Sequence, residues 1–542
     1  MAAERYEELS PSEFFYRNRE LAGFTNPSRS LYTAIRELFE NAMDACELHG
    51  IRPEILVVLR EVERTSQETA VYRLYVRDNG SGIPERHILD ALGRVLYSSK
   101  YVLRQSRGTF GLGGTMALLY GQITTNRPIR VVSATPGSKK IYEYVFKIDI
   151  RDNRAQVISV RRHRNSENWH GTIIDFMLEG NYPRVKSKIV DYFKYTAAIA
   201  PYAEITFVDP DGRLFFFRRT SSKMPKPPKE TKPHPHGVDF ETLRKMLMAA
   251  DPSTTIKDFM KRSFHRVGEK IAKSFLAYAG ISPDTTVGEV LGDKGDGLLE
   301  RFYRALQTYD KFLPPSADVL SPIGEEALRE GIMKEFHPQY LDIVVRPSSS
   351  YKGHPFIVEA AVAYGGDIPG GPGEVVLFRY ANKIPLLYDE GNDVARKVLN
   401  SISWSSYRRP QDGPVAFFVH ICSTKVPFKS VGKEFIADVP EVEREIELAF
   451  RELLRRLTRY TRKVLRRAEA EKRLSAFRRY LPQIARFATG LAGKRKVPDV
   501  EPLLEKVKER YGLEASGGSR EAGTPPSSPS GTRRRYRKGR SG

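Results

Sequence analysis

The stretch Glu37–Ala45 reads ELFENAMDA, and its side chains fall into two stripes. One stripe is apolar with three- and four-residue spacing, and it contains Ile35, Leu38, Phe39, Ala42 and Ala45. The other stripe is polar, because Glu37, Asn41 and Asp44 recur at i, i+4 and i+7 and so share a second face. The stretch therefore predicts an amphipathic helix that packs on one side and presents polar groups on another.

The polar face carries two groups that together suit a hydrolytic reaction. The amide oxygen of Asn41 can ligate a hard cation such as Mg²⁺, which takes oxygen ligands and keeps several waters. The carboxylate of Glu37, one turn away, can orient and deprotonate a nearby water. An ordinary solvated helix face is the alternative, and it would be preferred if this stretch stood alone. Two later stretches change that balance.

The second stretch runs from residue 74 to residue 84 and reads LYVRDNGSGIP. It predicts a strand that ends in a tight, glycine-bearing turn. Asp78 can accept a hydrogen bond from an exocyclic amine such as that of adenine. Gly80 and Gly82 have no side chain, so a flat ring can approach the backbone there. An Asp-Asn-Gly turn by itself is an ordinary hairpin signal.

The third stretch is a glycine loop that leads into an apolar helical pattern, MALLY, at residues 116–120. Its candidate phosphate-binding residues are Gly108, Thr109, Phe110, Gly111, Leu112, Gly113, Gly114 and Thr115. Backbone N–H groups at such a helix N-terminus suit phosphates. The loop is not a Walker loop, because no Gly-Lys-Ser/Thr follows. It is not the dinucleotide fingerprint either, because Met116 occupies the third glycine position.

In this order and spacing, the three stretches resemble the GHKL ATPase family, which includes gyrase, the ninety-kilodalton heat-shock chaperone, histidine kinases and MutL. The resemblance implies the Bergerat α/β sandwich as the fold, and ATP and Mg²⁺ as cofactors. It implies that Glu37 is the general base, Asn41 the Mg²⁺ ligand and Asp78 the adenine contact. It also implies that the glycine loop wraps the phosphates.

Two further segments fit the same resemblance. Gly171-Thr172 stands before apolar Ile173-Ile174 and resembles the fourth motif of the family, in which the threonine supports the adenine site. Ser99 and Lys100 lie just before the glycine loop, where a lid residue could reach phosphate. We therefore expect Thr172, Ser99 and Lys100 among the nucleotide-binding residues.

The composition indicates several domains and a polyanionic partner. The 542 residues include 88 Lys+Arg against 66 Asp+Glu, a net charge of +22. Such an excess favours binding to nucleic acid, although it could also serve solubility alone. The two cysteines, Cys46 and Cys422, are expected to be buried thiols in a reducing compartment. Neither a signal peptide nor an apolar run of membrane-spanning length is evident, so we expect a cytoplasmic, nucleoid-associated protein, or a nuclear one in a eukaryote.

Changes in pattern along the chain predict an α+β multidomain protein with five parts. Residues 1–228 form an N-terminal arm and the GHKL domain, and the arm either reaches a second protomer or packs on its own domain. Residues 229–310 resemble a helix-two-turns-helix module, which could bind DNA or be purely structural. Residues 311–472 resemble the transducer of type II topoisomerases, a ribosomal-protein-like α/β domain. Residues 473–514 continue a long C-terminal helix, and residues 515–542 form a disordered basic tail.

The transducer resemblance implies a loop lysine that reaches the γ-phosphate of ATP. Three lysines qualify, at positions 425, 429 and 433. Lys433 is the first candidate, because it stands just before a helical pattern that we expect to begin near Glu434. Lys425 and Lys429 are the alternates. If the resemblance to the family is set aside, the three lysines indicate only a basic surface.

Taken over nearly the whole chain, the order of domains resembles the B-subunit family of type IIB DNA topoisomerase, topoisomerase VI. The resemblance implies an ATP-hydrolysing subunit that works with a separate A subunit, in an assembly of two A and two B chains. The A subunit would cleave one DNA duplex while ATP-driven dimerisation of two B chains gates the passage of another. The implied outcome is relaxation of supercoils and decatenation, with double-stranded DNA as substrate and no membrane partner.

Two other functions remain open from the sequence. A MutL-like mismatch-repair ATPase also joins a GHKL unit to a transducer, but the helical module at about 238–310 argues against it. A DNA-binding scaffold that has lost turnover is the other alternative, and the presence of Glu37 and Asn41 argues against that.

Overall fold

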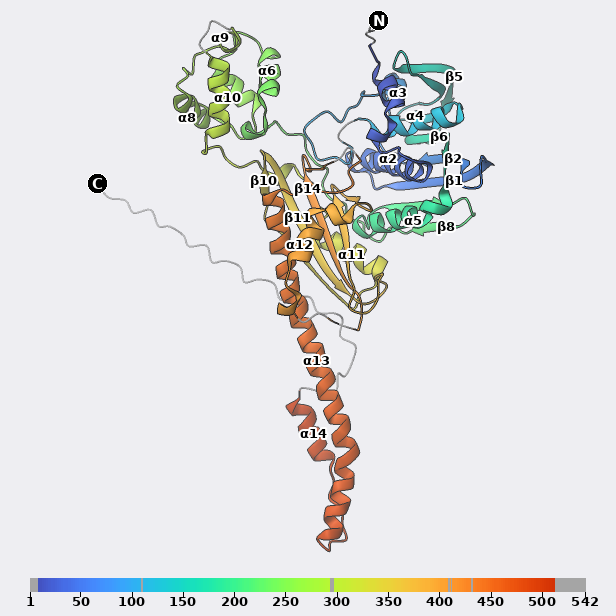
Figure 1. Ribbon diagram of the computed structural model, residues 1–542, viewed down its shortest axis with the longest axis vertical. Coiled ribbons are helices and arrows are strands. Elements are labelled where there is room, and N and C mark those ends of the chain that lie inside the picture. The colour runs from blue at the N-terminus through green and yellow to red at the C-terminus, as the bar shows by residue number, and fades with distance from the viewer. Residues whose placement is uncertain are drawn as a thin grey trace, which may run out of the picture. The chain divides into compact units, whose positions relative to one another are not determined.

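A computed structural model describes residues 8–108, 111–292, 297–407, 410, 412–429 and 432–511. The chain divides into two compact units, Met1–Thr458 and Arg459–Gly542. Within the first unit, Figure 1 shows two sheets and a separate group of helices. The expected α+β multidomain architecture is therefore confirmed. Among the described residues, no helix is both long and apolar enough to cross a bilayer.

The first sheet has eight strands in the order β5-β4-β3-β6-β2-β1-β7-β8. Their bounds are β1 (Glu54–Arg64), β2 (Ala70–Arg77), β3 (Ile129–Ala134), β4 (Lys140–Asp149), β5 (Arg154–Arg164), β6 (Gly171–Gly180), β7 (Glu204–Val208) and β8 (Leu214–Phe217). All neighbouring pairs are antiparallel except β1 and β7. In β1, Ile55, Val57 and Leu59 are buried and alternate with less buried residues, as in a strand whose two faces are covered unequally.

Helices and strands of the first sheet share one apolar core. The helices are α1 (Pro11–Arg17), α2 (Pro27–Glu47), α3 (Glu85–Gly93), α4 (Gly113–Thr125) and α5 (Tyr182–Ile199). The predicted amphipathic helix is α2, which begins where the Asn26 side chain accepts from the Arg29 N–H and Pro27 takes the first helical position. Both α2 and α4 pack on β6 and on each other. This packing brings the polar face of α2 against the N-terminus of α4.

The described part of the N-terminal arm packs on its own chain. The Ser10 hydroxyl donates to the Ile150 carbonyl at 2.6 Å, and Phe24 is buried in the core of the first sheet. Phe14 and Tyr16 are exposed. Two aromatic residues between positions 8 and 24, Phe15 and Phe24, therefore pack on the core of the first sheet, and the other two are exposed.

The residues from 238 to 312 form a helical module with a separate apolar core. Its helices are α6 (Phe240–Met248), α7 (Ile256–Ser263), α8 (Glu269–Ala279), α9 (Val287–Leu291) and α10 (Leu298–Thr308). The helical pattern expected for residues 238–310 is therefore present.

Short 3₁₀ turns occur outside this module. They are η1 (Arg19–Ala22), η2 (Pro235–Gly237), η3 (Ala317–Val319), η4 (Glu390–Asn392) and η5 (Trp404–Ser406).

The second sheet has the order β10-β11-β14-β12-β13, with β9 paired to β11. Its elements are β9 (Tyr340–Val345), β10 (Ser349–Tyr351), β11 (His354–Tyr364), β12 (Val375–Ala381), β13 (Ile384–Pro385) and β14 (Val415–Ser423), with helices α11 (Glu325–Phe336) and α12 (Val394–Ser401). Every residue of β14 is buried, which explains the apolar run at its start, residues 415–419. Cys422 lies in this strand and Cys46 in α2; both are buried and free, as expected.

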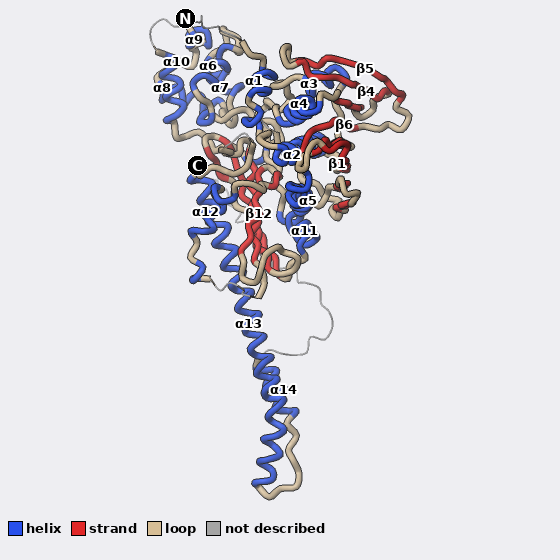
Figure 2. Tube along the Cα trace, turned by 45° about the vertical axis from the view of Figure 1, so that its right-hand side comes forward, coloured by secondary structure: helices blue, strands red, loops and turns tan. Residues whose placement is uncertain are grey.

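The long helix α13 (Pro440–Leu491) begins in the first unit and continues into the second, which also contains α14 (Glu501–Arg510) (Figure 2). The expected helix start near Glu434 is wrong. Long-range hydrogen bonds keep the preceding segment out of the helix, since the Ile436 N–H donates to the Asp393 carboxylate and the Ala437 N–H donates to the Pro427 carbonyl. The expected basic tail, 515–542, lies outside the described residues.

Candidate nucleotide site

The three stretches identified from the sequence line one cavity of about 580 Å³, a size typical of small-ligand sites. The helix α2, the end of β2, the glycine loop and a loop of the second sheet's domain contribute to its wall. The predicted residues that line it are Glu37, Asn41, Asp78, Gly82, Ser99, Lys100, Gly108, Gly111, Leu112, Gly113, Gly114, Thr115, Thr172 and Lys433. Thr109 and Phe110 lie outside the described residues. Gly80 is near the cavity but does not line it.

Asp78 lies buried at the floor of the cavity. Its Oδ1 accepts from the Gly80 N–H at 2.8 Å and from the Thr172 N–H at 3.2 Å. Burial raises the pKa of Asp78 to about 7, although these two backbone donors lower it. Since both bonds end on Oδ1, the carboxylate is oriented by the backbone and can offer Oδ2 to an amine.

Glycines let the backbone come close to the polar face of α2. A Cβ on Gly113 would overlap the Glu37 carboxylate, and a Cβ on Gly114 would lie 2.7 Å from Asn41 Nδ2. Gly111 has φ +61°, a conformation that favours glycine. The loop therefore requires glycine both for its turn and for its approach to α2.

Glu37 is surrounded by charge. The Arg36 Nη2 donates to Glu37 Oε1 at 2.6 Å, and Lys433 Nζ lies 3.7 Å from the same oxygen. Burial alone would raise the pKa of Glu37, but Lys433 and Arg36 lower it to about 2. Burial raises the pKa of neighbouring Glu40, whose Oε2 lies 3.6 Å from Lys433 Nζ. A carboxylate with so low a pKa is a weak base, so this arrangement holds Glu37 ionised and restrained.

Lys433 comes from the loop that follows β14, and its position differs from that of the two alternates. Lys433 is buried and lines the cavity, whereas Lys425 and Lys429 are exposed and do not line it. Its backbone is left-handed, with φ +52°. The adjacent Glu434 pairs with Arg29 at the start of α2. These contacts place one lysine of the three against the polar face of α2.

Lys100 contacts the amide oxygen that the sequence assigns to Mg²⁺. Its Nζ donates to Asn41 Oδ1 at 2.8 Å and to Asp44 Oδ2 at 2.7 Å. The Asn41 oxygen therefore faces a cationic group inside the cavity. Mg²⁺ is usually held by one or two protein oxygens together with phosphates. No group of three or more His, Cys, Asp or Glu side chains that could hold a metal by themselves occurs among the described residues. Asn41 fits a site in which one protein oxygen and the phosphates of a ligand hold Mg²⁺ together.

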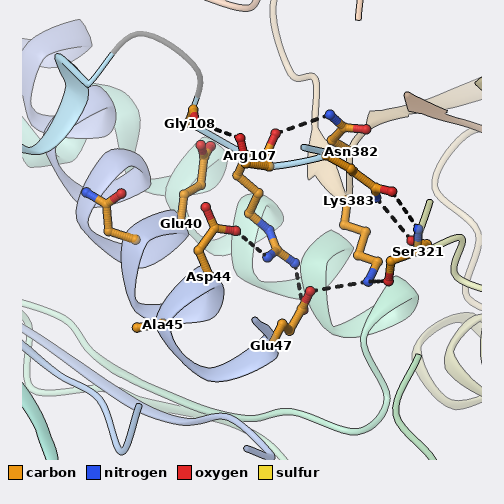
Figure 3. Close-up of polar contacts among 12 residues, drawn as sticks. Glu40, Asp44, Ala45, Glu47, Arg107, Gly108, Ser321, Asn382 and Lys383 are labelled. Atoms are coloured by element: carbon orange, nitrogen blue, oxygen red, sulfur yellow. Dashed lines mark hydrogen bonds and ion pairs between the residues drawn. The ribbon is translucent and has the colours of Figure 1, made fainter. Parts of the chain in front are cut away.

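The sequence did not single out several buried charges next to the cavity, drawn in Figure 3. Arg107 donates from Nη1 to Asp44 Oδ1 at 3.0 Å and from Nη2 to Glu47 Oε1 at 2.7 Å. Lys383 donates to Glu47 Oε2 at 3.2 Å. Glu40, Asp44 and Glu47 follow one another at three- and four-residue spacing, a signal that could have identified the acidic side. Nothing local marked Lys383.

Comparison with known proteins gives consistent similarities. Residues 315–473 match the family model described as "Topoisomerase VI B subunit, transducer". The chain is 46% identical over 486 residues to the B subunit of type 2 DNA topoisomerase 6 from Metallosphaera sedula, covering 90% of each chain. It is 42% identical over 513 residues to the corresponding protein of Sulfurisphaera tokodaii, covering 94% of this chain and 95% of that one. The ATPase region of Saccharomyces cerevisiae topoisomerase II aligns over 81% of this chain and 91% of that chain at 12% identity with a TM-score of 0.37, too low to carry an argument.

Proposed function

The chain belongs to the family of type 2 DNA topoisomerase 6 B subunits, and on this premise we propose how its cavity drives the reaction. As a member of the family, it is the ATP-hydrolysing B subunit of a type II DNA topoisomerase. The MutL-like alternative has less support, because relatives that align over about nine tenths of the chain are B subunits. The observation that carries the proposal is the meeting of Asp78, the glycine loop, Glu37 and Lys433 in one cavity.

We propose a distinct task for each side of the cavity. Asp78 binds the exocyclic amine of adenine, with Thr172 supporting it through the shared backbone bond. The N–H groups at the start of α4 bind phosphate oxygens. Lys100 can exchange its contacts with Asn41 and Asp44 for phosphate, because its side chain reaches the cavity wall. Ser99 lines the same wall.

Glu37 and Lys433 form the hydrolytic part of the proposal. While Lys433 pairs with Glu37, the low pKa of Glu37 makes it a poor base. A γ-phosphate offers Lys433 a stronger, charge-assisted partner. When Lys433 turns toward phosphate, Glu37 loses one of its cations and its pKa rises, so it can take a proton from water. Binding of the triphosphate thus activates the base.

Asn41 is the proposed Mg²⁺ ligand, through the amide oxygen that faces the cavity. The ion would neutralise charge on the phosphates. Lys100 must leave that oxygen first, so the same residue governs access to phosphate and to the ligand oxygen.

Membership of the family supports a proposal for the assembly. We propose two A and two B chains, with cleavage of double-stranded DNA performed by the A subunit and two B chains dimerising on ATP. We further propose functional boundaries at 1–228, 229–310, 311–472, 473–514 and 515–542. A net charge of +22 supports contact with DNA, and such an enzyme works where the DNA is, in a nucleoid or a nucleus.

Relaxation of supercoiled plasmid tests the function. This chain together with its A subunit should relax plasmid only with ATP, and the Glu37→Gln variant with the same A subunit should not. Relaxation by this chain alone, or relaxation that does not depend on ATP, would contradict the proposal.

A further inference from the structure

Five buried or half-buried charges of alternating sign lead from the cavity into the second sheet's domain, and Figure 3 labels the last four of them. In order they are Lys100, Asp44, Arg107, Glu47 and Lys383, joined by contacts of 2.7, 3.0, 2.7 and 3.2 Å. Burial would raise the pKa of Asp44 and of Glu47, but their cationic neighbours lower each to about 2. Both carboxylates are thus ionised. This series of five side chains therefore contains three cations and two anions.

The base of the glycine loop is also attached to the second sheet's domain. Gln105 exchanges hydrogen bonds with the backbone of Ser321, at 2.7 and 3.0 Å. The Asn382 amide donates to the Ser106 carbonyl at 3.1 Å. Consecutive residues before the loop therefore contact the domain that carries Lys433, rather than only the sheet that contributes Asp78.

Asn382 and Lys383 form the turn between β12 and β13. Both have positive φ, +46° and +65°, as the central residues of a type I′ hairpin turn do. Asn-Gly is the preferred pair for such a turn, and a lysine in this conformation is strained. Here the strained residue is buried and its Nζ donates to Glu47 and to Ser321 Oγ at 3.0 Å. The side chain, rather than the turn, therefore explains a lysine at this position.

We propose that Lys383 is a positioning residue that allows Lys100 to leave Asp44 and bind phosphate. This inference rests on the proposed function and names a further residue for the same cavity. With Lys383 present, Lys100 can leave while Arg107 and Lys383 still balance Asp44 and Glu47. Without Lys383, two cations face two buried carboxylates, and departure of Lys100 leaves one carboxylate uncompensated, which is costly.

The Lys383→Gly variant tests this without straining the turn, because it creates the preferred Asn-Gly pair. In calorimetric titrations of the full chain, the Kd for a non-hydrolysable ATP analogue should rise about tenfold, the scale of coupling within such networks. The Kd for adenosine, which has no phosphate for Lys100, should not change. Adding Glu47→Gln should restore affinity for the analogue, because the remaining two cations then face one carboxylate.

Lys352→Gly is the matched control. Lys352 also has positive φ, +44°, in a hairpin turn of the same sheet, but it is exposed and should leave both affinities unchanged. An unchanged analogue Kd for Lys383→Gly, a parallel loss of adenosine affinity, or a double variant no better than the single one would each overturn the inference. Failure of the unsubstituted chain to bind the analogue would overturn the proposed function, and this inference with it.

Discussion

Glu37 shows how neighbouring cations can hold one buried carboxylate in its ionised form. Its carboxylate accepts a hydrogen bond from Arg36. Lys433, which belongs to the second sheet's domain, places its Nζ 3.7 Å from Glu37 Oε1. The pKa of about 2 that results suits an ion pair better than proton transfer. Glu40 beside it has a raised pKa, because it is buried and near Glu37. The carboxylate of Glu37, the proposed base, is therefore held ionised by the cations around it.

Replacing Glu37 by glutamine should separate binding from turnover. The amide keeps the size of the side chain but cannot take a proton, so kcat should fall at least about a hundredfold while ATP still binds. Steady-state ATPase and equilibrium binding measure the two effects. Asn41→Ala is the comparison: it should lose Mg²⁺-dependent affinity instead. Identical behaviour of the two variants in Mg²⁺ titrations would show that the roles are not divided as proposed.

Asp78 should make the site selective for adenine. A site that hydrogen-bonds an amine strongly rejects a ligand that leaves it unpaired, so GTP should bind at least about a hundredfold more weakly than ATP. Asp78→Ala should abolish ATP binding. Competition titrations would measure both, and comparable affinities for GTP and ATP would remove the basis for this assignment.

The raised pKa of Asp78 adds a pH dependence. With a pKa of about 7 in the nucleotide-free protein, the carboxyl is largely protonated at pH 6 and ionised at pH 8. An amine donor prefers the ionised form, so affinity for adenosine should increase from pH 6 to pH 8. Adenosine is the suitable ligand because it has no phosphate that titrates in this range. The Asp78→Asn variant should show no such slope, and a slope that persists there would assign it to another group.

At the scale of elements, the loop between β14 and α13 determines which lysine enters the cavity. Hydrogen bonds to Asp393 and Pro427 hold residues 436 and 437, and the left-handed backbone at Lys433 directs its chain toward α2. Lys425 and Lys429 lie on the same loop but remain exposed. Of the three lysines, the loop therefore brings only Lys433 to the cavity.

Lys433→Ala should retain nucleotide binding, lose about a hundredfold in ATPase rate, and lose nearly all coupled DNA relaxation. The reason is that the variant removes the group that distinguishes ATP from ADP at the γ-phosphate, and such differential affinity is what shifts a conformational equilibrium. Lys425→Ala and Lys429→Ala are the controls. If Lys433→Ala has a normal rate and one of the controls is impaired, the lysine replaced in that control has the proposed role instead. If all three variants are normal, this loop does not have the proposed role.

At the scale of the whole molecule, nucleotide binding and assembly should be linked. Residues from two domains of one chain already meet at the cavity, and the aromatic side chains of Phe14 and Tyr16 remain exposed on the arm. The chain alone should be a monomer, and a non-hydrolysable ATP analogue should convert it to a dimer, because a ligand that binds the assembled state stabilises it. Light scattering with and without the analogue measures this. The Asp78→Ala variant should stay monomeric with the analogue. If the mass of the unsubstituted chain does not change when the analogue is added, the proposed ATP-driven dimerisation is contradicted.

The sequence by itself determined the features that depend on short-range patterns. The three- and four-residue spacing of ELFENAMDA specifies α2 and its polar face, because a helix places such residues on one side. The glycines from 111 to 114 specify a close loop before α4. The apolar run at residues 415–419 specifies the covered strand β14. In each case the physical constraint acts between residues that are close in sequence, so it can be recognised from a short stretch of the chain.

The tertiary structure alone decided which distant groups pair. Three lysines in one loop look alike in the sequence, and packing places only Lys433 beside Glu37. Glu47 and Lys383 are 336 positions apart, so no periodicity could connect them. The helix start near Glu434 was wrong for the same reason, since the Ile436 N–H donates to the side chain of Asp393, 43 positions away, instead of to a helical carbonyl. Charge pairing and burial depend on distance in space, and the chain encodes that distance only through the packing of the whole domain.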